Sequence, residues 1–191
     1  MKAILEAAAQ LLERDGYAAT TTDHIAERAG VSVGSLYQYF PNKDAILLAL
    51  AACHGLEGLE AFAPLTREFF SDPPPLEEGL RRLVRTCVGL HSRPRLHQIL
   101  FAETPFTPEM RHGLETAGEA VASGLAHYLA HAPGARVRDP KLAAHLLLAS
   151  LTDLVHGFVI APPAGYDMKR CEEELTTLLL RYLTGASEVT S

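Results

Sequence analysis

Polar and aromatic side chains recur at helical spacing between residues 33 and 43, and their chemistry suits a nucleic acid. Ser35 and Gln38 can hydrogen-bond to base edges in a DNA groove, while Gly34 permits close approach of the backbone. Nearby tyrosine hydroxyls and a lysine ammonium can bind phosphates. The residues that we predict to contact DNA are Thr22, Val33, Gly34, Ser35, Tyr37, Gln38, Tyr39 and Lys43.

Two short predicted helices and the turn between them would position these side chains. Thr22 is predicted to cap the first helix, because its hydroxyl can accept a backbone N–H from the first turn. Gly30 stands where the chain must leave that helix with a positive φ, Ser32 can cap the second helix, and Pro41 ends it. Helices this close together bury little of each other, so the pattern favours a helix-turn-helix for the DNA major groove over a simple helix pair.

These residues are part of a longer pattern that resembles the N-terminal domain of TetR-type transcriptional repressors. The residues that carry the resemblance are Ile4–Ala8, Leu11–Leu12, Gly16–Tyr17, Thr21–Thr22, Ile25–Ala26, Ala29–Ser32, Gly34–Tyr37, Tyr39–Phe40 and Lys43. They cover roughly the first quarter of the chain, and the total length of 191 residues also fits that family. The resemblance implies an all-helical homodimer whose C-terminal domain binds a small inducer, and we expect a repressor that binds a palindromic operator.

The charge of the chain argues mildly against strong non-specific DNA binding. The net charge is −6, and residues 1–50 contain four Lys or Arg against six Asp or Glu. Cations on phosphates supply most non-specific affinity, so neutral donors and dimerisation would have to supply much of the binding. The family often carries a basic arm before its first helix, which this sequence does not show, either because the protein lacks it or because its start is missing.

Composition favours a soluble protein of a reducing compartment. The three cysteines, Cys53, Cys87 and Cys171, are scattered and odd in number, unlike a disulfide framework. No uncharged apolar run reaches the roughly 18–20 residues of a membrane span. Met1-Lys2-Ala3 leads directly into an amphipathic helix, so we expect no signal peptide and a cytoplasmic location.

Hydrophobic periodicity predicts an all-α chain, since no segment shows sustained strand alternation. The predicted helices cover about residues 2–15, 22–29, 32–39, 42 onward, 76–91, 95–103, 107–131, 139–159 and 167–183. Gly55, Gly58 or Pro64 is expected to end or bend the helix that begins near residue 42. We divide the chain into a helix-turn-helix domain, 1–45, and a helical regulatory and dimerisation domain, 46–191.

The last two predicted helices are apolar around more than one face, which is more than a single core contact requires. They are either central core helices or a dimer surface, and the resemblance implies that they meet their twofold mates in a four-helix bundle. The predicted interface residues are His145, Ala149, Thr152, Leu175, Leu178, Leu179 and Tyr182.

Polar and aromatic side chains lie among the aliphatic residues of the larger domain, as a pocket for a small, mostly apolar inducer requires. The predicted ligand-binding residues are Arg85, His91, Phe101, Tyr128, Asp153 and His156. Bound inducer would favour a spacing of the two recognition helices that releases the operator. The operator, the inducer and the direction of its effect remain open.

Histidine and cysteine pairs offer an alternative chemistry. His127 and His131, and likewise Cys87 and His91, are four residues apart on predicted helices and can share a face. A metal site needs further ligands that no spacing reveals, so we predict no metal and no cofactor. No nucleophile elbow, phosphate loop or zinc-hydrolase motif occurs, and an enzyme is not expected. The alternatives are a metal-responsive regulator on the same fold and a helical protein that has lost DNA binding.

Overall fold

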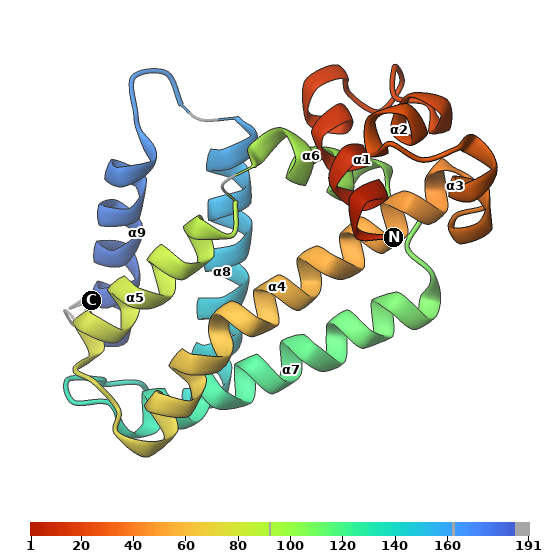
Figure 1. Cartoon of the computed structure of the whole chain (residues 1–191). Helices are drawn as coiled ribbons and strands as arrows, with labels where there is room; N and C mark the ends of the chain where they lie inside the picture. The colour runs from red at the N-terminus through yellow and green to blue at the C-terminus, as the bar shows by residue number, and fades with distance from the viewer. Residues whose placement is uncertain (92, 162, 186–191) are drawn as a thin grey trace. The chain divides into compact units, whose positions relative to one another are not determined.

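The chain is largely helical along the residues that its computed structural model describes, which are 1–91, 93–161 and 163–185. These residues contain no β-strand, which confirms the predicted all-α fold. Figure 1 shows the helices in chain order. They are α1 (Lys2–Asp15), α2 (Thr22–Ala29), α3 (Val33–Tyr39), α4 (Lys43–Ser71), α5 (Leu76–Gly89), α6 (Pro94–Glu103), α7 (Pro108–His131), α8 (Pro140–Ile160) and α9 (Met168–Leu183).

The described residues form two compact units, to both of which α4 contributes. The first unit comprises residues 1–57 and 93–111, and the second comprises the described parts of 58–92 and 112–191. A division into compact units need not coincide with a division into DNA-binding and regulatory functions. The functional boundary after residue 45 therefore stays a prediction.

The first unit packs α1, α2, α3, α6 and the start of α4 around one apolar core. α1 contributes a stripe at helical spacing, in which Ile4, Ala8 and Leu12 are each at most 1% exposed. Ile25 of α2 and Leu36 of α3 are fully buried in the same core. Because Leu36 alone anchors α3 from within the helix, the rest of that short helix is free to face outward.

α4 is one continuous helix of 29 residues, so none of Gly55, Gly58 and Pro64 ends it. Pro64 lacks the N–H that would bond to the carbonyl four residues earlier, which weakens the helix interior. Leu65 and Phe69, one and five residues after it, are buried in the core of the second unit. This burial offsets the lost hydrogen bond and holds the second half of the helix.

α4 is also long and apolar enough to cross a membrane by length and composition, with a mean hydropathy of 1.5 in a window that is 17% buried. The criterion of an uncharged run missed it because Glu57 and Glu60 interrupt the apolar sequence. Core helices of soluble proteins pass the same test, so the helix by itself assigns no membrane location. Its Leu56 and Leu59 remain 60% and 43% exposed.

The second unit is built around Tyr128 of α7, which is fully buried. Its ring stacks on Phe69 with 4.2 Å between the ring centroids. Its hydroxyl donates to the carbonyls of Pro74 and Pro75, at 3.2 and 3.3 Å. Burial raises the pKa of this hydroxyl, so it stays protonated as a donor. Tyr128 thus ties α7 to α4 and to the loop before α5.

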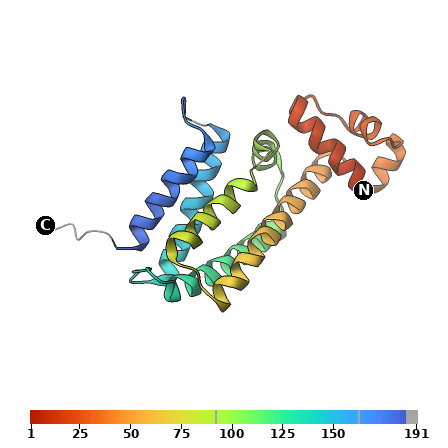
Figure 2. The same ribbon diagram turned by 60° about the vertical axis from the view of Figure 1, so that its left-hand side comes forward.

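α5, α8 and α9 complete the second unit, and α8 and α9 lie side by side in both ribbon views (Figures 1 and 2). Arg82 of α5 donates two hydrogen bonds of 2.6 Å to the carboxylate of Glu68, which joins α5 to α4. The backbone N–H of Arg136 donates to the carbonyl of Leu183 at 2.8 Å, which fixes the loop before α8 against the end of α9.

Replacing Gly79 with alanine should destabilise the second unit. The glycine lies against the Tyr128 ring and hydroxyl, and an added Cβ would collide with both. Overpacking a dense core costs about 1–3 kcal/mol, so Gly79→Ala should lower the free energy of unfolding in urea by that amount. The matched control is Gly118→Ala on α7, where nothing lies within 4 Å of the added Cβ. It should be neutral or stabilising by up to about 1 kcal/mol, and equal losses in both variants would refute the packing argument.

Candidate nucleic-acid interface

Side-chain caps and one glycine turn fix the two short helices. The hydroxyl of Thr21 accepts the backbone N–H of His24 at 3.2 Å, so Thr21, not the predicted Thr22, is the N-cap of α2. Gly30 ends α2 in the left-handed region at φ 69°, and Ser32 caps α3 by accepting the N–H of Ser35 at 3.1 Å. Both of these features agree with the sequence prediction.

Thr22 has a different role because it is the first residue inside α2. Its hydroxyl lies 3.1 Å from the hydroxyl of Tyr37, so these two predicted contact residues are joined by a hydrogen bond. Tyr37 remains 48% exposed. The bond links the start of α2 to α3 and places the two hydroxyls next to each other.

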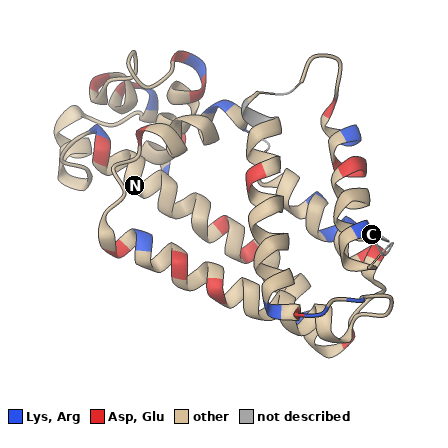
Figure 3. Ribbon diagram, turned by 180° about the vertical axis from the view of Figure 1, so that it is seen from behind, with Lys and Arg blue, Asp and Glu red and all other residues tan. Residues whose placement is uncertain are grey.

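The outer face of α3 carries the remaining predicted contact residues. Val33, Gly34, Gln38 and Tyr39 are exposed, with Tyr39 at 58%. Ser35 is half-buried and shares its hydroxyl with that of Ser32 at 2.8 Å. α3 contains no charged residue, as Figure 3 shows. Its exposed face therefore offers neutral hydrogen-bonding groups and methyl groups, which is what base-edge recognition uses.

Lys43 lies at the start of α4 and is already engaged within the protein. Its ammonium donates to the carbonyls of Tyr17 and Thr20, at 2.8 and 3.0 Å, and lies 3.8 Å from the centre of the Tyr17 ring. The Tyr17 hydroxyl donates to Asp44 at 2.9 Å. Two of the three ammonium donors thus hold the α1–α2 linker to α4, and a phosphate would have to use the third.

Three arginines of the first unit also have side-chain partners, two of which are carboxylates. Arg28 donates to the side-chain carbonyl of Gln10, at 2.9 Å from its Nε, and Arg93 forms a 2.8 Å ion pair with Glu13. Arg14 pairs with the adjacent Asp15 at 2.6 Å. These pairings agree with the weak non-specific DNA affinity that the charge balance predicts.

The predicted ligand-binding residues of the second unit divide among different environments. Tyr128 is a structural residue of the core, and Asp153 is exposed on α8. His91 is buried and meets His156 edge-to-face, with 4.8 Å between ring centroids. Phe101 belongs to the first unit, where it is 64% exposed on α6. The structure therefore brings His91 and His156 together.

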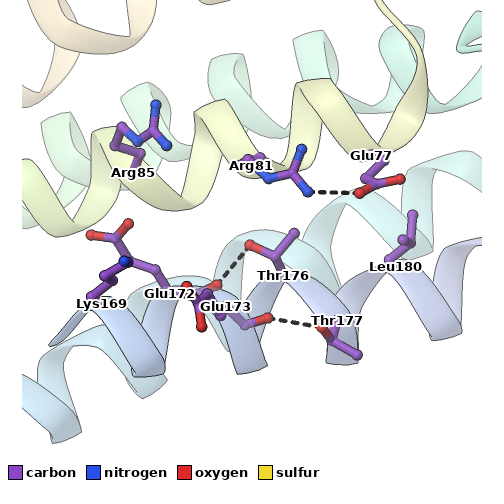
Figure 4. Close-up of a pocket in the computed structure, with 9 residues that line it drawn as sticks. All are labelled: Glu77, Arg81, Arg85, Lys169, Glu172, Glu173, Thr176, Thr177 and Leu180. Atoms are coloured by element: carbon purple, nitrogen blue, oxygen red, sulfur yellow. Dashed lines mark hydrogen bonds and ion pairs between the residues drawn. The ribbon is translucent and has the colours of Figure 1, made fainter. Parts of the chain in front are cut away.

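Arg85 lines a separate groove of about 360 Å³ between α5 and α9 (Figure 4). The groove is rimmed by charged side chains of both signs, and Arg81 forms a 2.6 Å ion pair with Glu77. Lys169 and Glu172 of α9 lie opposite Arg85. Such a lining does not suit a mostly apolar ligand, because charged groups would lose water without apolar contacts in return.

The predicted interface residues also divide between two faces. Leu175 and Leu179 are 4% and 5% exposed and lie in the core of their own chain. Leu178 and Tyr182, on the other side of α9, are 56% and 49% exposed. On α8, the exposed predicted residues are His145 and Ala149, while Thr152 is half-buried.

Two further leucines of α8 share the helical spacing of the predicted interface residues and are also exposed. Leu142 and Leu146 are 55% and 46% exposed and lie four residues apart. Their spacing was visible in the sequence, but the two leucines could not be separated from core leucines of the same helix without knowing which face α8 buries.

Cys87 and His91, which share a face of the predicted helix, are in contact through the backbone of Cys87. The Nδ1 of His91 is 2.7 Å from the backbone carbonyl of Cys87. Burial raises the pKa of the Cys87 thiol to about 11, so the thiolate that a metal needs is strongly disfavoured.

Family comparisons agree with this architecture. The model of "Bacterial regulatory proteins, tetR family" matches residues 4–50, and that of "Tetracyclin repressor-like, C-terminal domain" matches residues 75–183. An uncharacterized HTH-type transcriptional regulator of Bacillus subtilis, YvkB, is 49% identical over 53 residues, 28% of each protein. The repressor KstR of Rhodococcus jostii is 45% identical over 51 residues, 27% of this chain and 24% of KstR. The chain thus spans about a quarter of the length of the curated relatives that it matches.

Solved structures match nearly the whole chain. SmeT, the repressor of a multidrug efflux pump of Stenotrophomonas maltophilia, superposes with a TM-score of 0.67 at 25% identity, covering 95% of this chain and 89% of SmeT. A TetR/AcrR-family regulator of Thermobifida fusca gives a TM-score of 0.72 at 23% identity, covering 97% of both chains. Since one family model covers the N-terminal residues and another covers more than half of the chain, the chain belongs to the tetR family of bacterial regulatory proteins.

Proposed function

We propose that the chain is a cytoplasmic, homodimeric transcriptional repressor that binds a palindromic operator and is released by a small, mostly apolar inducer. The observation that carries this proposal is the exposed, uncharged face of α3 on a capped helix-turn-helix. Recognition helices of this motif enter the major groove and contact base edges with their first residues. The proposed DNA contacts remain the eight residues predicted from the sequence. Lys43 can use only the third N–H of its ammonium for a phosphate, because the other two are bonded within the protein.

Gly34 supports the proposed close approach to DNA. A Cβ at this position would meet only ordinary contact, 3.9 Å from the Ser32 hydroxyl. The fold therefore has room for a side chain there, and a glycine inside a helix costs roughly 1 kcal/mol relative to alanine. The fold does not require a glycine at this second position of α3. Close contact between the helix and the DNA major groove would explain it, because a side chain there would occupy the space between the backbone and the bases.

The face of α8 and α9 supports the proposed dimer. Leu142, Leu146, Leu178 and Tyr182 are each about half exposed on two adjacent helices. Four large apolar side chains on one helix pair suit a second copy, which would cover them by twofold symmetry. A dimer also doubles the DNA contacts and requires two half-sites related by the same symmetry.

The inducer proposal rests on the fold and on one residue pair. SmeT, which has this fold, has also been solved in complex with triclosan, and this supports a small-molecule ligand for the present chain. In the present chain we retain His91 and His156 as candidates for fixing the polar end of a ligand. Tyr128 is removed from the proposed set because it is a buried core residue, and Arg85 is removed because it lines a groove rimmed by charged side chains.

The proposed function is tested by titrating DNA from upstream of the chain's own gene and following fluorescence anisotropy. Gln38→Ala should weaken binding to the operator by about 1–3 kcal/mol and leave helicity unchanged, because the side chain is exposed and would contact a base edge. Gln98→Ala, an exposed glutamine of α6 in the same unit, is the matched control and should bind like the parent protein. Equal binding by all three proteins would exclude the role assigned to α3.

Lys43→Met should lower stability, because it keeps the apolar stem but removes both hydrogen bonds to the linker carbonyls. Hydrogen bonds to a charged group contribute roughly 1.5–3 kcal/mol, which urea unfolding would detect. The stability of the variant could instead be unchanged while the slope of log DNA affinity against log salt concentration falls by about one unit. That result would show that Lys43 serves mainly as a phosphate contact.

Leu178→Glu should dissociate the dimer and leave the monomer folded, because the side chain is exposed in the single chain. Leu179→Glu should instead unfold the second unit, since it buries an unpaired carboxylate at a cost of several kcal/mol. Light scattering for mass and circular dichroism for helicity separate the two outcomes. Leu114→Glu on the exposed part of α7 is the control and should keep the dimer mass. A Leu178→Glu protein that remains dimeric would place the interface elsewhere.

A further inference from the structure

The seven residues of α3 contain no charged side chain, which limits the bases that this helix can recognise. In the major groove, Arg and Lys bind guanine, Asp and Glu accept from cytosine, Asn and Gln bind adenine, and apolar groups contact the methyl group of thymine. α3 therefore carries neither the usual partner of guanine nor that of cytosine. Gln38 and Val33, which are both exposed, instead match adenine and thymine.

Gln38 lies near the centre of the exposed face of α3. Gly34 lies four residues before it on the same side of the helix, and both are about 160° around the axis from the buried Leu36. Side chains on a helix lean toward its N-terminus, so the Gln38 amide can extend past Gly34 without meeting a side chain at that position. The glycine thus leaves room for the amide to reach a base edge.

Val33 and the hydroxyl-bearing residues occupy the flanks of that face. Val33 is 39% exposed and lies about 140° from Gln38 around the axis, so the two side chains would contact different base pairs. The hydroxyl groups of Ser35, Tyr37 and Tyr39 can each donate or accept, so they favour no particular base. Selectivity between bases then depends on Val33 and Gln38.

The cations nearest to α3 along the chain, Arg28 and Lys43, already donate to other groups of the first unit. Arg28 donates to the side-chain carbonyl of Gln10, and Lys43 donates to the carbonyls of Tyr17 and Thr20. These bonds disfavour a guanine contact from either side chain, because such a contact would have to compete with them.

We propose that α3 recognises A·T base pairs in each half-site of the operator. The Gln38 amide accepts from N6 of an adenine and donates to its N7, and the Val33 side chain contacts the methyl group of a thymine at another base pair. This inference rests on the proposed function, because it names the bases that the same helix reads. It goes beyond that function in excluding guanine as a base that α3 recognises.

The test uses a DNA duplex that the full chain itself selects from a random-sequence library. Single bases of each half-site are then replaced, one position at a time, by analogues that remove one group. Uracil lacks the methyl group of thymine, 7-deazaadenine lacks N7 of adenine, and 7-deazaguanine lacks N7 of guanine. Dissociation constants are measured by fluorescence anisotropy at one salt concentration, because affinity for DNA varies strongly with salt.

For the parent chain, uracil at one position should weaken binding about fourfold for each methyl group removed. The adenine analogue at another position should weaken it about fivefold or more, because the amide N–H of Gln38 loses its acceptor. The guanine analogue should leave binding unchanged at every position. Val33→Ala should abolish the response to uracil and keep the response to 7-deazaadenine, and Gln38→Ala should do the reverse.

Gln98→Ala on α6 is the matched control and should keep both responses. Val33 and Gln38 are exposed, so their variants should fold, which circular dichroism checks. The base assignment is overturned if 7-deazaguanine weakens binding by the parent chain, or if uracil and 7-deazaadenine do not. These comparisons need no variant, so they decide the assignment even where a variant binds too weakly to measure. Responses that persist unchanged in Val33→Ala and Gln38→Ala would overturn the roles of the two residues.

Failure of the proposed function would give a different result. A chain that selects no sequence over random DNA would refute the repressor proposal together with this inference. A chain that binds a selected duplex, but whose binding responds to the guanine analogue, would refute the base assignment alone.

Discussion

The ammonium of Lys43, at the start of α4, holds the linker between α1 and α2 in place by two hydrogen bonds. The position of α3 depends on these bonds. The linker between α1 and α2 has carbonyls that no helix satisfies, and two of them, from Tyr17 and Thr20, accept from Lys43. Buried or half-buried backbone carbonyls need such partners. Since Lys43 begins α4, the chain segment that contains α2 and α3 is held at both of its ends. α3 can then expose most of its surface while only Leu36 anchors it from within.

This use of a cation for folding has a consequence for DNA binding. Arg14 and Arg93 form ion pairs with carboxylates, and Arg28 donates to the neutral side chain of Gln10, so these three cations are also engaged within the first unit. We expect low non-specific affinity, because residues 1–50 carry more acidic than basic side chains. The predicted hydrogen bonds from Ser35 and Gln38 to base edges do not depend on that charge. A DNA-binding domain of this kind would gain discrimination between DNA sequences at the expense of total affinity. Pairing two such domains in one dimer is the direct way to restore that affinity, which gives the exposed leucines of α8 and α9 their proposed role.

Short-range features of the fold were predictable because their causes lie within a few residues. Gly30, Ser32 and the helix after Pro41 follow from local backbone chemistry, and only the α2 cap moved, from Thr22 to Thr21. The faces of α9 were not predictable in the same way. Periodicity gives the spacing of apolar residues, but Leu178 and Leu179 are adjacent and differ by about 100° around the helix. Which of them is buried depends on how α9 packs against α5 and α8, which no local pattern contains.

Sites assembled from distant segments were the least predictable, for two physical reasons. A polar side chain among apolar residues must have a hydrogen-bond partner, but the sequence does not tell whether that partner is a ligand or another part of the protein. The Tyr128 hydroxyl suggested a ligand, yet its partners are carbonyls of the proline-rich loop before α5, a segment poor in N–H groups that could satisfy them. The second reason is register between helices. The four-residue spacing of His127 and His131 is visible in one helix, but that His145 lines one groove with them depends on the turn between α7 and α8. The Asp139 cap and the bond from Arg136 to Leu183 help to set that turn, and with it which side chains of α8 face α7.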